Sequence, residues 1–147
     1  MEELINKMKG VLADTFAMYI KAHGYHWNVI GADFPQLHSF FEDVYGELWA
    51  AVDDIAEQIR QLDAFAQGTL SRMKELSSIE ESDSIPTAPN MVTNLISSNE
   101  AILNNLKEAY KLAEENEIYG LSNFLQDRMM AHKKLGWKLK ATAGRKQ

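Results

Sequence analysis

The sequence predicts an all-α protein, a four-helix bundle made of two helical hairpins that a long crossover connection joins. Apolar residues recur at helical spacing along almost the whole chain, and no run alternates as a strand does. A stretch rich in serine and proline, residues 68–89, separates the two hairpins. With 147 residues the chain is long enough for a real core, and we treat residues 1–147 as a single domain.

The first hairpin comes from two long amphipathic segments. The first helix is expected over residues 3–29, and Gly31 ends it because glycine readily leaves the helical conformation. The second helix is expected over residues 35–65, since Pro35 suits the first turn of a helix.

The second hairpin follows the crossover. Residues 70–76 are expected to form a short extra helix, which makes so long a connection tolerable. A third long helix is expected over residues 90–115, and a fourth runs from about residue 120 to about residue 141. Two hairpins joined by one long crossover are typical of a ferritin-like four-helix bundle rather than of a simple up-and-down bundle.

Composition narrows the classes of function. The chain contains no cysteine, so any metal site must use histidine and carboxylate ligands. A net charge of −6 argues against a protein whose main body binds nucleic acid, because phosphates need cations. The amino-terminal residues lack an apolar signal core, and no apolar run is long enough to cross a bilayer, so we expect no membrane contact and a cytoplasmic protein.

The most informative pattern is a mirror-symmetric set of metal-ligand side chains on the second helix: His38 and Glu42, then Asp53 and Glu57. Each pair is spaced i, i+4, so its two members share one face of the helix. The pairs lie roughly 22 Å apart at about 1.5 Å per residue, too far to share one ion. An antiparallel second copy would bring His38 opposite Glu57 and Glu42 opposite Asp53, which predicts two mixed metal sites at a two-fold interface.

The face of the helix that carries these ligands differs from its core face and its solvent face. It mixes the acids with small and aromatic residues, including Gly46 and Trp49. A single i, i+4 pair usually lies on a solvated surface, but carboxylates dehydrated at an interface need a cation or a partner group to offset the loss of water. Imidazole mixed with carboxylate suits a first-row metal such as iron, with zinc or manganese as alternatives.

The remaining histidines are weaker candidates. His26 closes the apolar stripe of the first helix and is a candidate fifth ligand, although a lone histidine there is more often a hydrogen-bonded core residue. His23 is expected near the site or on the surface, and His132, in a lysine-rich segment, on the surface. The methionines are expected to pack in the core: Met18, Met73, Met91, Met129 and Met130.

No H-E-x-x-H motif is present, which excludes a zincin protease. No E-x-x-H motif is present either, so a metal site inside the bundle core is not expected.

Three segments resemble the Dps family, the DNA-binding proteins from starved cells or mini-ferritins: His26-Trp27-Asn28-Val29, Leu37-His38 with Glu42, and Asp53-Asp54-Ile55-Ala56-Glu57-Gln58-Ile59. The resemblance covers essentially the whole chain.

This resemblance implies a homo-oligomeric shell, a dodecamer built from two-fold dimers. The shell would oxidise Fe(II), preferably with hydrogen peroxide, store the ferric product and limit oxidative damage. His26, His38 and Glu42 from one subunit would hold iron together with Asp53 and Glu57 from the other. Trp27 would lie beside this ferroxidase centre and could quench radicals.

Departures from the family leave alternatives open. Asn123 stands where an aspartate often lines the pores through which iron enters, with Glu117 and Asp127 nearby. The family commonly binds DNA through a lysine-rich flexible terminus, whereas the basic residues here form a short carboxy-terminal group: Lys138, Lys140, Arg145 and Lys146. A DNA-compacting protein with incidental metal and a metal-stapled shell without redox turnover are the competing functions.

Overall fold

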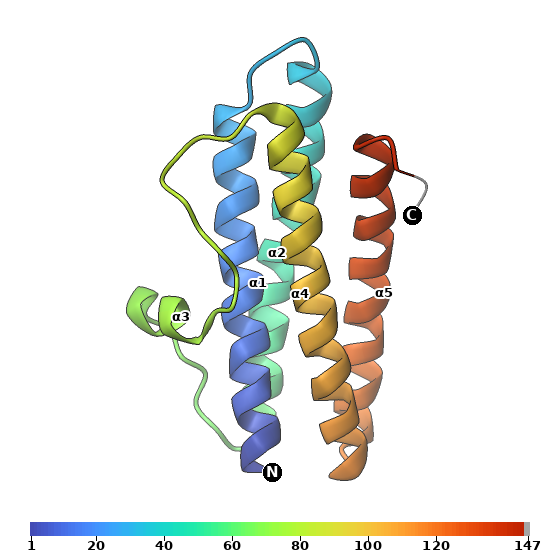
Figure 1. Cartoon of the computed structure of the whole chain (residues 1–147). Coiled ribbons are helices and arrows are strands. Elements are labelled where there is room, and N and C mark those ends of the chain that lie inside the picture. Colours follow the sequence, from blue (N-terminus) through green and yellow to red (C-terminus); the bar gives the residue numbers. More distant parts are fainter. Residues whose placement is uncertain (146–147) are drawn as a thin grey trace.

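The computed structural model describes residues 1–145, which form five helices and no strand. The helices are α1 (Glu2–Asn28), α2 (Phe34–Gln61), α3 (Leu70–Leu76), α4 (Ala88–Glu115) and α5 (Tyr119–Thr142). The hairpin of α1 and α2 lies beside the hairpin of α4 and α5, and α3 sits on the crossover outside α1 (Figure 1). The predicted all-α, ferritin-like bundle with a short helix in its crossover is confirmed. None of the helices in this part of the chain is long and apolar enough to cross a membrane.

The ends of the first hairpin follow from local conformation. Gly31 has a φ of 126°, which only glycine adopts readily, and it separates α1 from α2 as predicted. The second helix ends at Gln61, four residues before its predicted end. Asp63 adopts a left-handed conformation with a φ of 61°, which halts the helical ladder although apolar residues continue to Phe65.

The short helix within the crossover, α3, and the helix that follows the crossover, α4, both begin at threonine caps. The hydroxyl of Thr69 accepts a hydrogen bond from the backbone N–H of Arg72, at 3.3 Å, and starts α3. Thr87 accepts one from Asn90, at 3.4 Å, and starts α4 two residues before its predicted beginning. Both hydroxyls satisfy N–H groups that a helix leaves without partners.

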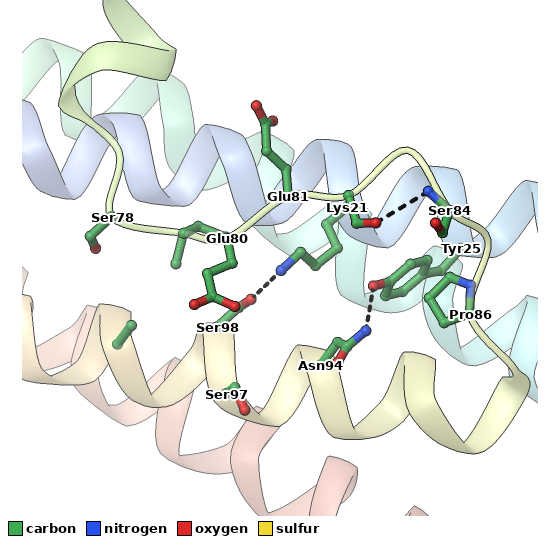
Figure 2. A pocket seen from close by; sticks show the side chains of 13 residues that line it. Lys21, Tyr25, Ser78, Glu80, Glu81, Ser84, Pro86, Asn94, Ser97 and Ser98 are labelled. Atoms are coloured by element: carbon green, nitrogen blue, oxygen red, sulfur yellow. Dashed lines mark hydrogen bonds between the residues drawn. The ribbon is translucent and has the colours of Figure 1, made fainter.

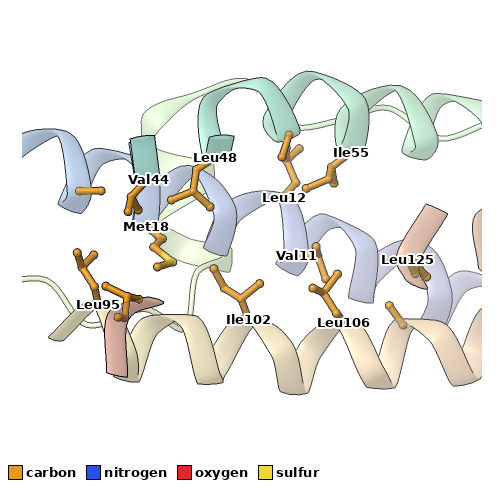
Figure 3. Packing of buried hydrophobic residues seen from close by; sticks show 14 of the residues in the cluster. Val11, Leu12, Met18, Val44, Leu48, Ile55, Leu95, Ile102, Leu106 and Leu125 are labelled. Carbon is orange, nitrogen blue, oxygen red and sulfur yellow. The ribbon is translucent and has the colours of Figure 1, made fainter. Parts of the chain in front are cut away.

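The core is a continuous layer of aliphatic side chains between the two hairpins. Figure 3 shows Leu48 and Ile55 of α2 beside Leu12 of α1, with Ile102 and Leu106 of α4 facing them. Each of these five side chains is almost completely buried. The apolar period of α2 predicts a core face, and this face is confirmed except that Phe40 and Leu62 are only partly buried: Leu37, Phe40, Phe41, Val44, Leu48, Ile55, Ile59 and Leu62.

A buried carboxylate fixes the crossover to the bundle. Asp14 of α1 accepts hydrogen bonds from the Ser78 backbone N–H at 2.6 Å, the Ser77 hydroxyl at 3.1 Å and the Asn105 amide at 2.6 Å. Because these donors come from the crossover and from α4, Asp14 holds three segments together. These bonds compensate for the water that the carboxylate loses.

A polar cavity of about 560 Å³ lies beyond this anchor, between the crossover, α1 and α4 (Figure 2). Lys21 donates to the Ser98 hydroxyl at 2.9 Å, and Asn94 donates to the Tyr25 hydroxyl at 3.1 Å. Burial lowers the pKa of Lys21, and Glu80 counteracts part of this effect. None of the cavity's lining residues is a histidine, so it does not match the expected metal ligands.

The expectation that His132 is exposed is wrong, because its side chain is only 1% exposed. Its Nδ1 lies 2.7 Å from the Asn99 side-chain oxygen on α4, and Arg128 donates to its Nε2 at 3.1 Å. Arg128 also forms an ion pair with Glu47 of α2. The sequence could not reveal this burial, since the surrounding lysines point outward while His132 points into the α4–α5 interface.

One methionine also departs from expectation. Met130 is 70% exposed, because it lies on the outer side of α5. Met18 and Met91 are buried, and Met73 and Met129 are partly buried against the core, as predicted.

Candidate metal centre

The end of α1 and the beginning of α2 place two candidate ligands face to face. The rings of His26 and His38 are stacked, with centroids 3.7 Å apart and planes 16° apart. His26 Nδ1 lies 2.7 Å from the backbone oxygen of His38, and His38 Nδ1 lies 2.7 Å from the backbone oxygen of His26. The two residues therefore hold each other's rings in place through their main chains.

This reciprocal pairing determines which ring nitrogen is free. A carbonyl oxygen can only accept, so each Nδ1 carries its proton and donates it. Each Nε2 then keeps its lone pair, the form in which imidazole binds a metal. A metal-bound histidine usually donates the N–H of its other ring nitrogen to a nearby acceptor, which fixes the orientation of the ring.

Glu42 lies one helical turn after His38, so its carboxylate projects from the same face of α2. It is exposed, whereas His26 is only 8% exposed. We call His26, His38 and Glu42 the imidazole half-site, although their ligand atoms do not all lie within 4.8 Å of one another as those of the acidic group described next do. With two imidazoles and one carboxylate, this half-site leaves coordination positions that other groups must fill.

The opposite end of α2 carries an acidic group, Asp53, Asp54 and Glu57, which we call the carboxylate half-site. Each residue offers an oxygen, and these oxygens all lie within 4.8 Å of one another. The nearby Asp53 carboxylate raises the pKa of Glu57, with smaller effects of burial and Asp54. Three acids held this close repel one another, and a cation would relieve the repulsion. Asp54 was not among the predicted ligands, since it lies on the solvent face of the helix.

A single chain does not bring the two half-sites together. Glu42 and Asp53 are eleven positions apart along α2, roughly 16 Å at about 1.5 Å per residue. The predicted ligands thus lie in two groups at opposite ends of one helix, as the mirror-symmetric spacing requires. That they meet across a two-fold axis stays a prediction, because it concerns a second copy of the chain.

Large apolar side chains are exposed around the half-sites. Trp27 is 67% exposed at the end of α1, and Trp49 is 58% exposed in the middle of α2. Further exposed apolar residues lie near the ends of these helices: Ile30, Phe34 and Phe65. Exposed aromatic side chains of this size mark protein–protein contact surfaces. Of these residues only Trp49 belongs to the face of α2 that the sequence marks as an interface, and its contact with a second subunit stays a prediction.

His23 lies beside the imidazole half-site rather than within it. Its ring stacks on Tyr45 with centroids 3.8 Å apart, and its Nδ1 lies 2.9 Å from the Tyr19 hydroxyl. Trp27 is next to it, with ring centroids 4.5 Å apart. The i, i+4 spacing of Tyr19 and His23 on α1 is visible in the sequence, whereas the stacking on Tyr45 is not, because Tyr45 belongs to another helix.

The residues singled out for the passage of iron lie around the beginning of α5. Glu117, Asn123 and Asp127 are all exposed. Glu117 has a φ of 58° and forms the turn between α4 and α5. An amide at Asn123 carries no charge, so the acids available here are Glu117 and Asp127.

The helix order, the long crossover and the imidazole and carboxylate half-sites define a ferritin-like protein. The family model described as a ferritin-like domain matches residues 5–146. The chain is 33% identical to general stress protein 20U of Bacillus subtilis over 97% of this chain and 99% of that protein. It is 32% identical to DNA protection during starvation protein 2 of Bacillus anthracis over 95% and 93% of the two chains.

Solved structures agree with these relatives. The Dps protein of Vibrio cholerae O1, described as a member of a broad superfamily of ferritin-like diiron-carboxylate proteins, superposes with a TM-score of 0.91 and 28% identity, covering 95% of this chain and 88% of that one. Dps from Staphylococcus aureus superposes with a TM-score of 0.93 and 26% identity, covering 97% and 96%. The chain belongs to the Dps family of ferritin-like proteins.

Proposed function

We propose that this protein stores iron and protects against oxidative damage by oxidising Fe(II), preferably with hydrogen peroxide, at a dinuclear centre between two-fold-related subunits. The observation that carries this proposal is the reciprocal pairing of His26 and His38, which leaves both Nε2 atoms free for a metal. Membership of the family supports iron binding and oxidation at a coarser level.

In this proposal, His26, His38 and Glu42 of one subunit face Asp53 and Glu57 of its two-fold partner. The donor set of imidazole nitrogens and carboxylate oxygens suits iron, and it would also accept zinc or manganese as surrogates. Carboxylates crowded at one end of α2 balance positive charge that increases as Fe(II) becomes Fe(III). Asp54 is near enough to Asp53 to join them.

The chemistry requires two iron ions close together. Each Fe(II) gives up one electron, and one hydrogen peroxide molecule accepts both electrons with two protons to become two water molecules. Such pairwise reduction avoids the hydroxyl radical that a single Fe(II) releases from peroxide. The protein supplies fixed ligands and open coordination positions for the oxidant.

We further propose that the ferric product is kept inside a closed homo-oligomeric shell, a dodecamer built from two-fold dimers. The exposed Trp27 and Trp49 support a contact surface beside the half-sites. The DNA-compacting alternative has less support, because Lys140 is paired with Glu100 at 3.6 Å and the chain carries a net charge of −6.

Iron and peroxide titrations test this function. We expect the protein to consume about two Fe(II) per hydrogen peroxide and to keep the ferric product in solution, because two one-electron donors share one two-electron acceptor. Fe(II) remaining after each addition of peroxide would be measured with a chelator, and hydroxyl radical with a spin trap. Consumption of one Fe(II) per peroxide with trapped hydroxyl radical would contradict the proposal. A bound metal that never turns over would favour the metal-stapled shell.

A further inference from the structure

An aromatic cluster extends from the imidazole half-site to the surface of α2. The ring of His26 lies edge-on to Tyr45, with centroids 5.2 Å apart. Tyr45 is 6.2 Å from Tyr19, and Tyr19 is 4.9 Å from Trp49, which is exposed. Neighbouring rings are thus close enough for an electron to pass from one to the next without crossing a gap of aliphatic side chains.

Within this cluster, Tyr19 has a base in contact with its hydroxyl. The hydroxyl oxygen of Tyr19 lies 2.9 Å from Nδ1 of His23, within hydrogen-bond distance. Nδ1 accepts this bond when the His23 ring carries its proton on Nε2. Stacking on Tyr45, with planes 12° apart, holds the His23 ring in this orientation.

This contact matters because a phenol that loses an electron becomes a strong acid. Its oxidation is therefore easy only where a base can take the proton in the same event. Proton transfer requires a base within hydrogen-bond reach, and Tyr19 meets that condition through His23. Trp27 and Trp49 are exposed, and within residues 1–145 neither indole has a hydrogen bond to a side-chain base.

We propose that Tyr19 and His23 form a proton-coupled redox pair that removes single oxidising equivalents from the iron centre, an inference that rests on the proposed function. When one Fe(II) meets peroxide alone, it yields Fe(III), hydroxide and a hydroxyl radical. The radical takes one electron, relayed through Tyr45 from Tyr19, and becomes hydroxide. The Tyr19 hydroxyl proton moves to Nδ1 of His23, so a neutral tyrosyl radical and a protonated imidazole remain.

A second Fe(II) completes the cycle. It gives one electron to the Tyr19 radical, His23 returns the proton, and the products are Fe(III), intact tyrosine and neutral histidine. Two Fe(II) are still oxidised for one peroxide, as in the pairwise reaction. His23 is a positioning residue and proton acceptor in this scheme, and it does not bind iron.

Pulse radiolysis with the azidyl radical, a one-electron oxidant, tests the pair without iron. We expect the intact protein to form a tyrosyl radical, Tyr19→Phe to lose most of it, and Tyr110→Phe, a matched change on α4, to leave it unchanged. His23→Gln keeps a hydrogen-bond acceptor but removes the base, so radical formation should slow on the order of 100-fold. Equal rates in the intact protein and in His23→Gln would overturn the inference.

A second measurement connects the pair to iron. With Fe(II) and peroxide, we expect the tyrosyl signal in electron paramagnetic resonance to disappear in Tyr19→Phe and to remain in Tyr110→Phe. If iron oxidation is normal and the tyrosyl signal is the same in the intact protein and in Tyr19→Phe, the redox pair is overturned and the proposed function is not. Iron oxidation that does not depend on His38 would instead overturn the proposed function, while the azidyl result would still stand.

Discussion

Replacing His38 by alanine is expected to slow peroxide-driven iron oxidation by at least roughly 100-fold, and Asp53→Ala is expected to do the same. His38→Ala removes one Nε2 ligand and also the donor that orients His26 through its backbone oxygen. Asp53→Ala removes the carboxylate that has the largest effect on the pKa of Glu57. The initial rate of Fe(III) formation after mixing with Fe(II) and peroxide measures both losses.

Asp43→Ala is the matched control for these variants. Asp43 is an exposed acid of α2 that lies outside both half-sites, so its loss removes one negative charge without removing a ligand. Its rate should stay within about twofold of the original, since a single exposed charge has little effect at ordinary salt. A loss as large as that of Asp53→Ala would mean that general surface charge, and not ligation, governs the reaction.

Lowering the pH from about 7 to about 4.5 is expected to reduce the free energy of unfolding by about 2 kcal/mol through His132 alone. Burial and, to a smaller extent, the neighbouring Arg128 cation lower the pKa of His132 from 6.5 to about 4, although Glu47 acts in the opposite direction. Between these two values the unfolded chain binds a proton that the folded chain rejects. Stability is therefore complete above about pH 6.5 and decreases as the pH falls toward 4.

Urea unfolding of the intact protein and of His132→Gln at several pH values measures this effect. The glutamine variant cannot take up the proton, so its stability should change less with pH by about 2 kcal/mol over the same range. Its stability at neutral pH will be lower if the amide fails to replace both hydrogen bonds, and only the pH slope is diagnostic. An identical slope in the two proteins would show that His132 is not the group responsible.

The sequence was sufficient for the fold because its signals are local. Gly31, Pro35 and the apolar period of α2 predict the first hairpin, whereas the caps at Thr69 and Thr87 were not predicted and α4 begins two residues before its expected start. The end of α2 was the main error, since the left-handed turn at Asp63 has no apolar signature.

The candidate site was predictable only where its members lie on one helix. The i, i+4 spacing on α2 identifies Glu42, Asp53 and Glu57 without any tertiary information. The exchange of hydrogen bonds between His26 and His38 depends on how α1 meets α2, and no periodicity reveals it. For the same reason the sequence could not show that His132 contacts Asn99, 33 residues away.

Mixing two inactive variants tests most directly whether a centre is shared between subunits. In a mixed dimer of His38→Ala and Asp53→Ala subunits, one centre combines the intact His38 of one subunit with the intact Asp53 of the other. The second centre contains both substitutions and is inactive. After unfolding and refolding an equal mixture, half of the dimers are mixed, so activity should return to about a quarter of the original. Recovery near that value supports a centre built by two chains. If the refolded mixture is no more active than either variant alone, the ligands of each centre come from one chain, and the account is contradicted.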